Sequence, residues 1–158
     1  MHETTNITHN KIGDERMKSS KDILLSTIKT AQMGQNGIRS LLNTPLEYSL
    51  KESLRSQLKE YDQIEREGLE IAAARGLTAN ELDPSIQTMT NMMTKTRLFL
   101  GNANSKAAAM MIRGNIRGII KGYKNLNQYT PADAKVLALS HKLLEYEENG
   151  IRTMQGFL

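Results

Sequence analysis

Residues 19–43 read SSKDILLSTIKTAQMGQNGIRSLLN, and this stretch decides the fold. Apolar side chains recur in it every three or four residues, which is the spacing of one face of an α-helix. The seam of this face consists of Leu24, Ile28, Ala31, Gln35, Ile38 and Leu42. Gln35 therefore stands at a position where an inward-facing apolar residue is expected.

The ends of this first helix and of its partner carry recognisable signals. Ser19 or Ser20 is expected to cap the first helix, and the turn that contains Pro45 is expected to end it. A second helical pattern follows Pro45. Arg75 and Gly76 predict its end, because glycine readily takes the left-handed conformation that stops a helix.

The second half of the chain continues the helical pattern from Ser85 to about residue 128, which is too long for a single helix of a globular domain. We predict a break at residues 101–105, with Asn104 or Ser105 capping a new helix and a shorter helix before the break. Thr130 and Pro131 predict the start of the last helix, as its N-cap and first residue.

Composition supports an all-α class. The chain of 158 residues fits one domain, aromatic residues make up 4%, and neither Trp nor Cys occurs. We expect an antiparallel four-helix bundle over residues 19–158, with an extra short helix before the third main helix. Residues 1–18 are polar and lack periodicity, which indicates a flexible N-terminal tail.

Several classes of protein are not favoured by this sequence. The absence of Cys excludes disulfides, thiolate metal sites and cysteine nucleophiles. No run of about 18 apolar residues predicts a membrane span, and the first residues lack the layout of a signal peptide, so we expect a cytoplasmic protein. The net charge of +4 comes from mixed acidic and basic residues, which is weak evidence for a nucleic-acid partner.

Four polar residues interrupt the apolar seams and could converge in the middle of the bundle: Gln35, Gln57, Tyr61 and Glu147. Their oxygen atoms could bind a hard cation. The alternative, which we favour, is a buried hydrogen-bond network in which Glu147 pairs with Arg113 or Arg117.

A second pattern with metal-like spacing lies on the last helix. His141, Glu145 and Glu148 are four and then three residues apart, which places them on one helix face. A solvated surface stripe explains this spacing equally simply, and we favour it. The chain contains no Glu-x-x-His sequence, the motif that di-metal helical bundles use.

Gly114, Gly118 and Gly122 recur at every fourth residue, which leaves a smooth groove along one side of the third main helix. Close packing of another backbone, from the last helix or from another subunit, is the interpretation we favour. A ligand lying in the groove is the alternative.

A basic stripe runs beside these glycines and consists of Arg113, Arg117, Lys121 and Lys124. It could bind phosphate or a nucleic-acid backbone. Pairing with the acidic segment 145–148 of the last helix is the simpler interpretation, and few aromatic residues are near to stack on bases.

Several short segments carry a resemblance to a known family: MG at 33–34, IRSLL at 38–42, QLKEY at 57–61, MMIRG at 110–114, GII at 118–120, LLEYEEN at 143–149 and QGFL at 155–158. On these segments the chain resembles the ferritin-like superfamily. Within that superfamily it is similar to bacterial families of unknown function and to spore coat F type proteins.

The resemblance implies a bundle in which carboxylates and histidines of four helices hold two metal ions. The matching positions here are Gln35 in the first helix, Glu60 followed by Gln63 in the second, Arg113 or Gly114 in the third, and Glu147 followed by Gly150 in the fourth. The full ligand set is missing. The resemblance therefore implies the fold, and it does not imply oxidase or iron-storage activity.

The sequence thus predicts a non-catalytic ferritin-like bundle that acts as a structural or interaction module, with no cofactor and with a protein partner or self-association. One alternative is an atypical iron or manganese site built from Glu147, Glu60 and His141. The other is an anionic or nucleic-acid partner bound through the basic stripe.

Overall fold

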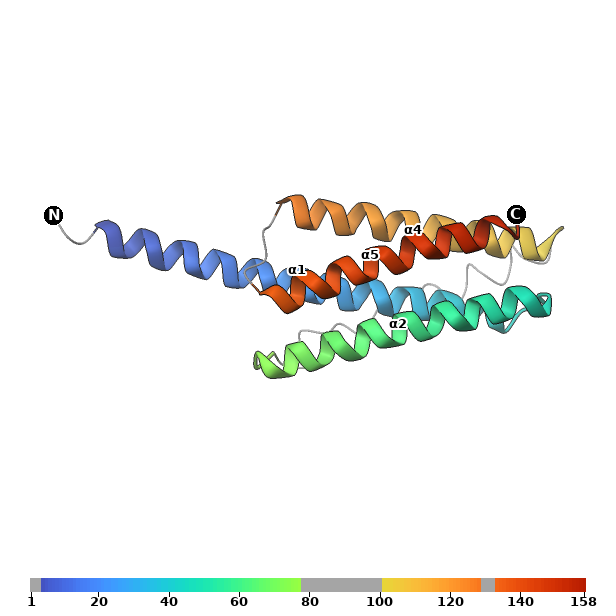
Figure 1. The fold of residues 1–158 in the computed structure, drawn as a ribbon, viewed down its shortest axis with the longest axis horizontal. Coiled ribbons are helices and arrows are strands. Elements are labelled where there is room, and N and C mark those ends of the chain that lie inside the picture. The colour runs from blue at the N-terminus through green and yellow to red at the C-terminus, as the bar shows by residue number, and fades with distance from the viewer. Residues whose placement is uncertain (1–3, 78–100, 129–132) are drawn as a thin grey trace.

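A computed structural model describes the backbone of residues 4–77, 101–128 and 133–158, and the side chains of these ranges from Ser20 onward. The described residues form four α-helices and contain no strand, which confirms the all-α prediction. The helices are α1 (Thr4–Leu42), α2 (Tyr48–Ala74), α4 (Ala103–Gln128) and α5 (Ala134–Gln155) (Figure 1). The short helix expected before residue 101 lies outside the described residues.

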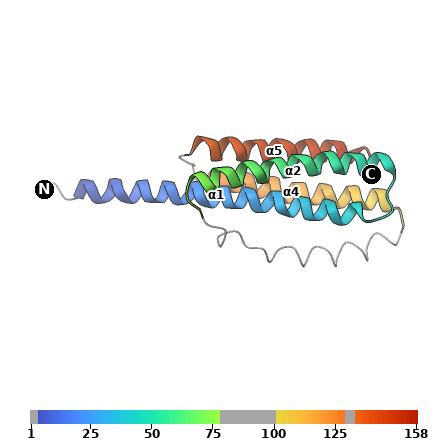
Figure 2. The same cartoon turned by 90° about the horizontal axis from the view of Figure 1, so that it is seen from below.

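The four helices lie side by side along one long axis (Figures 1 and 2). α1 and α5 run toward one end of the molecule, and α2 and α4 run toward the other (Figure 1). At one end the Glu47 backbone N–H donates to Asn104 Oδ1 at 3.0 Å, and at the other Arg75 Nε lies 2.7 Å from Asp133 Oδ2. The chain between α2 and α4 therefore connects opposite ends of the molecule.

α1 begins at Thr4, well before the start that was predicted at Ser19 or Ser20, so that prediction is wrong. The additional turns extend past the ends of the other three helices (Figure 2). Helix formation is cooperative, because each residue added to an existing helix gains one backbone hydrogen bond at little nucleation cost. The packed part of α1 can therefore propagate into a segment that has no apolar stripe of its own.

The predicted end of α2 is confirmed. Gly76 has a φ of +69°, and its N–H donates to the Ala73 carbonyl at 3.1 Å. The Leu77 N–H donates to the Ala72 carbonyl at 3.0 Å, which completes a Schellman motif.

The break before α4 is also confirmed, but its cap is not the predicted one. Gly101 has a φ of +96°, and Asn102 Oδ1 accepts from the Ser105 N–H at 3.3 Å. Asn102 is therefore the N-cap, because it precedes the first helical residue and satisfies a free N–H of the first turn. Asn104, one of the predicted caps, instead binds the Glu47 backbone at the start of α2.

The N-cap of α5 is also a different residue from the predicted one. Asp133 caps the helix by accepting from the Lys135 N–H at 3.0 Å, so the predicted N-cap at Thr130 is wrong. Thr130 and Pro131 lie outside the described residues. Asp133 also pairs with Arg75, which explains why the pKa of its carboxyl is lowered.

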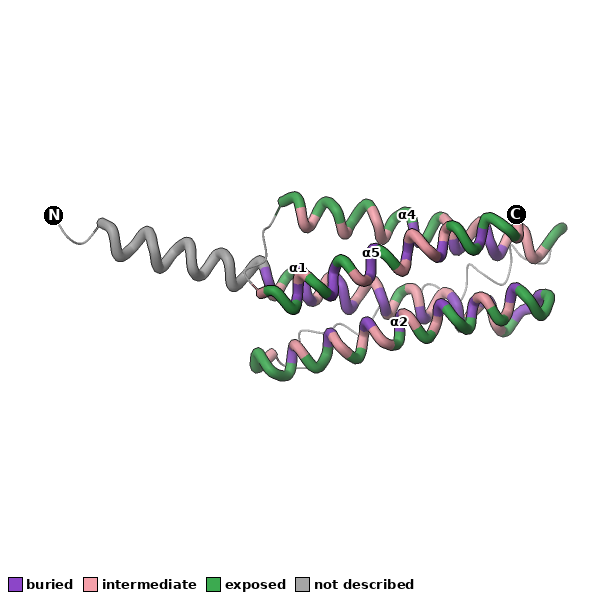
Figure 3. Tube along the Cα trace, in the orientation of Figure 1, coloured by how far each residue is buried: buried purple, intermediate pink, exposed green. Residues whose placement is uncertain are grey.

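One core runs through the bundle, and all four helices contribute buried residues to it (Figure 3). Its largest fully buried members include Leu24, Ile28, Ile38, Leu50, Leu54, Ile64, Val136 and Met154. α4 contributes least: its buried residues are Ala107, Ala108, Met111 and Asn115, all in its first half. Within the described helices, none is both long and apolar enough to cross a membrane.

Candidate functional site

Four buried polar side chains gather between α2, α4 and α5: Gln57, Tyr61, Asn115 and Glu147. We call them the central polar cluster. The Tyr61 hydroxyl donates to Asn115 Oδ1 at 2.9 Å, and burial, together with the charge of Glu147, raises the pKa of Tyr61. Three members were expected from the interrupted seams, whereas Asn115 was missed.

Glycines make room for this cluster. A Cβ added to Gly34 would lie 2.6 Å from the Tyr61 ring, and one added to Gly118 would overlap the Glu147 carboxylate. A Cβ added to Gly150 would lie 2.5 Å from Asn115 Nδ2. Each of these glycines costs helix propensity, so a packing reason was to be expected at each of them. Gly150 was therefore the signal in the sequence for a closely packed side chain at this point, and that side chain is Asn115.

Three atoms of the cluster have no hydrogen-bond partner within the described part of the chain: Gln57 Nε2, Asn115 Nδ2 and Glu147 Oε2. Burial raises the pKa of Glu147 to about 8, so its carboxyl is mostly neutral at pH 7. Glu147 is 2% exposed, and its hydrogen bonds with water are therefore lost on folding. Unpaired buried polar atoms are costly, and such a group in a native protein calls for an explanation.

Gln35 does not join this cluster, so the expected convergence of the four seam residues is wrong in this respect. Its Nε2 donates to Glu65 Oε2 at 2.6 Å, and Gln32 Nε2 donates to Glu65 Oε1 at 2.9 Å. Arg39 lies at hydrogen-bond distance from Gln35 Oε1. Gln35 thus serves an α1–α2 contact in which its polar group is satisfied.

A groove of about 520 Å³ opens between α1 and α4, beside the central polar cluster. One face of α1 and one face of α4 form its two walls, while α2 and α5 supply residues between them. The α1 wall consists of Thr30, Met33, Gly34, Gly37 and Leu41. The α4 wall consists of Met110, Met111, Arg113, Gly114, Asn115, Arg117, Gly118 and Lys121, and the remaining lining residues are Tyr61 and Glu147.

The expected glycine groove of α4 is divided between two environments. Gly118 and Gly122 face α5, where added Cβ atoms would meet Glu147 and Leu144. Side chains of α5, rather than a second backbone, therefore approach these two glycines. A Cβ at Gly114 or at Gly37 of α1 would meet no described atom within 4 Å, so both positions face open space in the groove.

The basic stripe on α4 is exposed at Arg113, Arg117, Lys121 and Lys124. Within the ranges given above, none of the four forms an ion pair or a hydrogen bond. The predicted pairing of Glu147 with Arg113 or Arg117 is therefore not found, and the acidic segment 145–148 does not neutralise the stripe. Glu148 instead accepts a hydrogen bond from Tyr123 at 3.2 Å.

An apolar row lies beside this stripe on α4. Ile116, Ile120 and Tyr123 are 43%, 51% and 45% exposed and follow one another at intervals of one helical turn. A single large apolar side chain at this exposure is common on protein surfaces. A row of them beside unpaired cations forms an amphipathic face.

The candidate metal ligands do not come together. Glu147 and His141 are six positions apart on α5. This spacing corresponds to a rotation of about 240° around the helix axis, so the two side chains point in different directions. His141 is exposed. Glu60 is half-buried, and burial raises its pKa. Among the described residues, no three His, Cys, Asp or Glu side chains form a group that could hold a metal ion.

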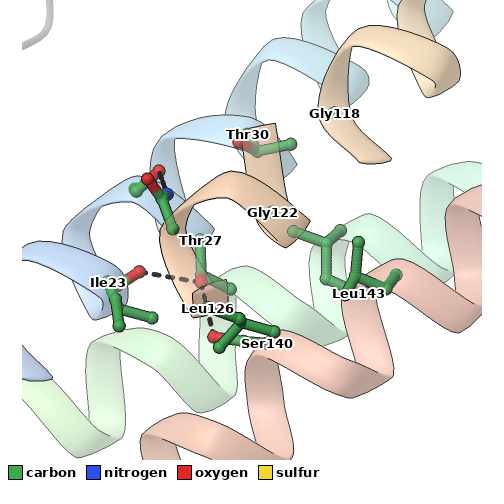
Figure 4. A pocket seen from close by; sticks show the side chains of 11 residues that line it. Ile23, Thr27, Thr30, Gly118, Gly122, Leu126, Ser140 and Leu143 are labelled. Atoms are coloured by element: carbon green, nitrogen blue, oxygen red, sulfur yellow. Dashed lines mark hydrogen bonds between the residues drawn. The ribbon is translucent and has the colours of Figure 1, made fainter. Parts of the chain in front are cut away.

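A smaller polar contact joins α1 to α5 farther along the bundle (Figure 4). The Thr27 hydroxyl donates to the Ile23 carbonyl at 2.8 Å, so Ser140, 3.0 Å away, donates to Thr27. Gly122 of α4 lies beside this pair (Figure 4). The cavity here holds only about 10 Å³, roughly one water molecule, so we assign it no ligand.

The sequence matches no protein-family model, and the comparisons with curated proteins and with solved structures return no match.

Proposed function

We propose that this chain is an antiparallel, ferritin-like four-helix bundle without a catalytic metal centre, and that it acts as an interaction module. The directions of the helices support the ferritin-like topology. α2 and α4 point the same way (Figure 1), so a crossover along the length of the molecule joins two helical hairpins, as in ferritin-like folds.

The donor set at the centre of the bundle does not fit the di-metal site of that superfamily. Such a site needs several carboxylates and histidines from facing helices. The central polar cluster offers one carboxyl, two amides and a phenol whose raised pKa keeps it protonated. The unpaired Gln57 Nε2 and Asn115 Nδ2 are hydrogen-bond donors and cannot bind a cation.

The observation that carries the interaction role is the outer face of α4. It combines the exposed apolar row Ile116, Ile120 and Tyr123 with a basic stripe that has no acidic partner among the described side chains. An apolar row provides contact area, and adjacent charges select an acidic partner. A protein surface with an acidic rim, on another protein or on a second copy, fits this face.

Elemental analysis tests whether the metal centre is absent. Protein purified without a metal-affinity tag is compared with Glu147→Ala. We expect both to contain far less than one equivalent of transition metal. We also expect their melting temperatures to stay the same when iron or manganese is added, because a metal that does not bind the folded state cannot stabilise it. Near-stoichiometric metal that is lost in the variant would instead establish the atypical metal site.

Multi-angle light scattering tests self-association through the outer face. If a second copy is the partner, the mass of the wild type rises with concentration and Ile120→Lys keeps the protein monomeric. Leu69→Lys on α2 is the matched control, because Leu69 is also exposed but lies away from this face. A monomeric wild type at all concentrations would leave a different protein as the partner of α4.

The same face could also bind nucleic acid, since the unpaired cations are available to phosphates. This second function predicts oligonucleotide binding that weakens by orders of magnitude as salt rises from 50 to 200 mM, as expected for several phosphate contacts. Absence of that salt dependence in a fluorescence-anisotropy titration would exclude it.

A further inference from the structure

We propose that the groove between α1 and α4 is a binding site for a small anionic amphiphile, with its charged head at Arg113, Arg117 and Lys121 and its apolar body along the methionines. This site goes beyond the proposed interaction role, because it takes a small molecule in the groove, although it shares Arg113, Arg117 and Lys121 with the basic stripe of that role.

The size and the walls of the groove fit such a molecule. Its volume of about 520 Å³ lies within the range of roughly 300–1,000 Å³ that small-molecule sites occupy. Met33 is 50% exposed on the α1 wall, and Met110 and Met111 face it from α4. Methionine side chains are flexible and polarizable, so they adapt to apolar ligands of varied shape.

The groove exists because side chains are missing from both of its walls. Gly37 and Gly114 each leave space that an alanine methyl group could occupy without meeting a described atom. Each glycine costs about 1 kcal/mol of helix propensity relative to alanine. Packing explains Gly34 and Gly118, which make room for Tyr61 and Glu147, but among the described residues no packing partner explains Gly37 or Gly114. A ligand would supply one.

The charges of the side chains that line the groove favour a ligand with a negatively charged head group. The lining contains three cationic side chains, Arg113, Arg117 and Lys121, and one acidic side chain, Glu147. The three cations lack ion-pair partners within the described ranges, so an anion could bind them without displacing an existing partner. The planar guanidinium group of an arginine also matches the two oxygens of a carboxylate or phosphate.

The buried side of the groove supplies the polar contacts that fix the ligand. Glu147 lines the groove, is 2% exposed, and forms no hydrogen bond with a described residue, with Oε2 among the unpartnered buried atoms. Because burial raises the pKa of Glu147 to about 8, the carboxyl at neutral pH is mostly uncharged and does not repel an anion. The neutral carboxyl can then donate a hydrogen bond to a ligand oxygen.

Isothermal titration calorimetry with sodium decanoate tests the site. Decanoate combines a carboxylate with an apolar chain, whereas acetate has the head alone and decyltrimethylammonium has a chain of the same length with the opposite charge. We expect saturable one-to-one binding of decanoate, and affinities at least tenfold lower for acetate and decyltrimethylammonium.

Variants then place the binding in the groove. Gly114→Leu on α4 and Gly37→Leu on α1 fill it from opposite walls, and each is expected to weaken decanoate binding at least tenfold while circular dichroism shows an intact fold. Arg113→Ala combined with Arg117→Ala is expected to weaken it by a similar factor. Lys124→Ala is the matched control, because Lys124 belongs to the same stripe but does not line the groove.

Three results would overturn the proposal. They are the absence of saturable decanoate binding, equal binding of decyltrimethylammonium, and unchanged affinity in both groove-filling variants with intact folds. None of these bears on metal content or on self-association, so the proposed interaction role would stand or fall separately.

Discussion

Glu147 is the residue whose chemistry is most altered by the fold. It is one of the buried polar residues of the bundle, and no cation of the described structure compensates its charge, so desolvation alone raises its pKa. The interior therefore holds the carboxyl in its neutral form. The seam of α5 predicted that Glu147 points inward, but not its protonation, because protonation depends on whether the arginines of α4 turn toward it.

This environment predicts that stability falls as pH rises. Burial raises the pKa of Glu147 to about 8 in the folded protein from 4.5 for a solvent-exposed glutamate, so between these values the folded state holds a proton that the unfolded state has released. We expect Glu147→Gln to have the stability of the wild type below pH 4.5 and to exceed it by on the order of 3–5 kcal/mol above pH 8. Urea denaturation across pH measures this.

Parallel pH profiles for the wild type and Glu147→Gln would contradict this prediction, because they would mean that another group neutralises the carboxylate. Glu145→Gln is the control, since Glu145 lies two residues away on α5 and is exposed.

The Tyr61 hydroxyl offers a second prediction at the scale of one atom. It donates to the buried Asn115 Oδ1, so Tyr61→Phe leaves that oxygen without its donor. We expect a loss of about 1–3 kcal/mol in the free energy of unfolding. Tyr48→Phe, at a hydroxyl on an exposed residue, should change it little. An unchanged stability in Tyr61→Phe would show that water reaches Asn115.

At the scale of the element, α4 is unusual because one side packs closely against α5 and another side faces an open groove. Its side toward α5 is so close that Gly118 cannot carry a Cβ without displacing Glu147, whereas Gly114, one turn earlier, faces the open groove. The spacing of the glycines alone predicted one continuous surface along α4. It could not divide that surface, because the division depends on which neighbour approaches each turn.

The two glycines should therefore respond oppositely to alanine. Gly114→Ala is expected to raise stability by about 0.8–1 kcal/mol, through helix propensity without a clash. Gly118→Ala is expected to lower it by about 1–3 kcal/mol, because the methyl group forces the Glu147 carboxylate to move. Thermal unfolding of both variants, at the same pH, measures the difference. Equal shifts would show that α4 and α5 are farther apart than described.

The ends of the elements show the same limit of sequence reasoning. The stop at Gly76 and the break at Gly101 were predicted, since a positive φ is a local property of glycine. The caps Asn102 and Asp133 were not. Several residues near the start of each helix can cap it, so the sequence does not select one of them. The side chain of Asn104 accepts a hydrogen bond from the Glu47 backbone instead of capping α4.

At the scale of the whole molecule, the core is shared unequally. α2 and α5 place buried residues along their full length, whereas α4 places none after Asn115 among the residues that are described. The sequence predicted four packed helices from apolar periodicity. It did not predict that α4 would turn Ile116 and Ile120 outward, because these positions continue an apolar pattern that is indistinguishable from a buried one.

This distribution predicts uneven protection from hydrogen exchange. Backbone amides of residues 119–128 should exchange through local opening, at least tenfold faster than those in the middle of α2, because few buried contacts oppose fraying there. Exchange measured by mass spectrometry on peptic fragments distinguishes the two segments. Equal protection in α2 and in the end of α4 would require a covering contact that the described residues do not supply.

The opposed positions of the end of α2 and the start of α4 also limit how the chain can be cut and rejoined. α2 spans 27 residues, roughly 40 Å of helix, and a fully extended linker covers at most about 3.6 Å per residue. A replacement for residues 78–100 thus needs about 12 residues or more. With a shorter linker, the two hairpins of one molecule could no longer reach each other, and each would have to pair with the complementary hairpin of a second molecule. Linker length alone would then convert a self-contained fold into an exchanged dimer.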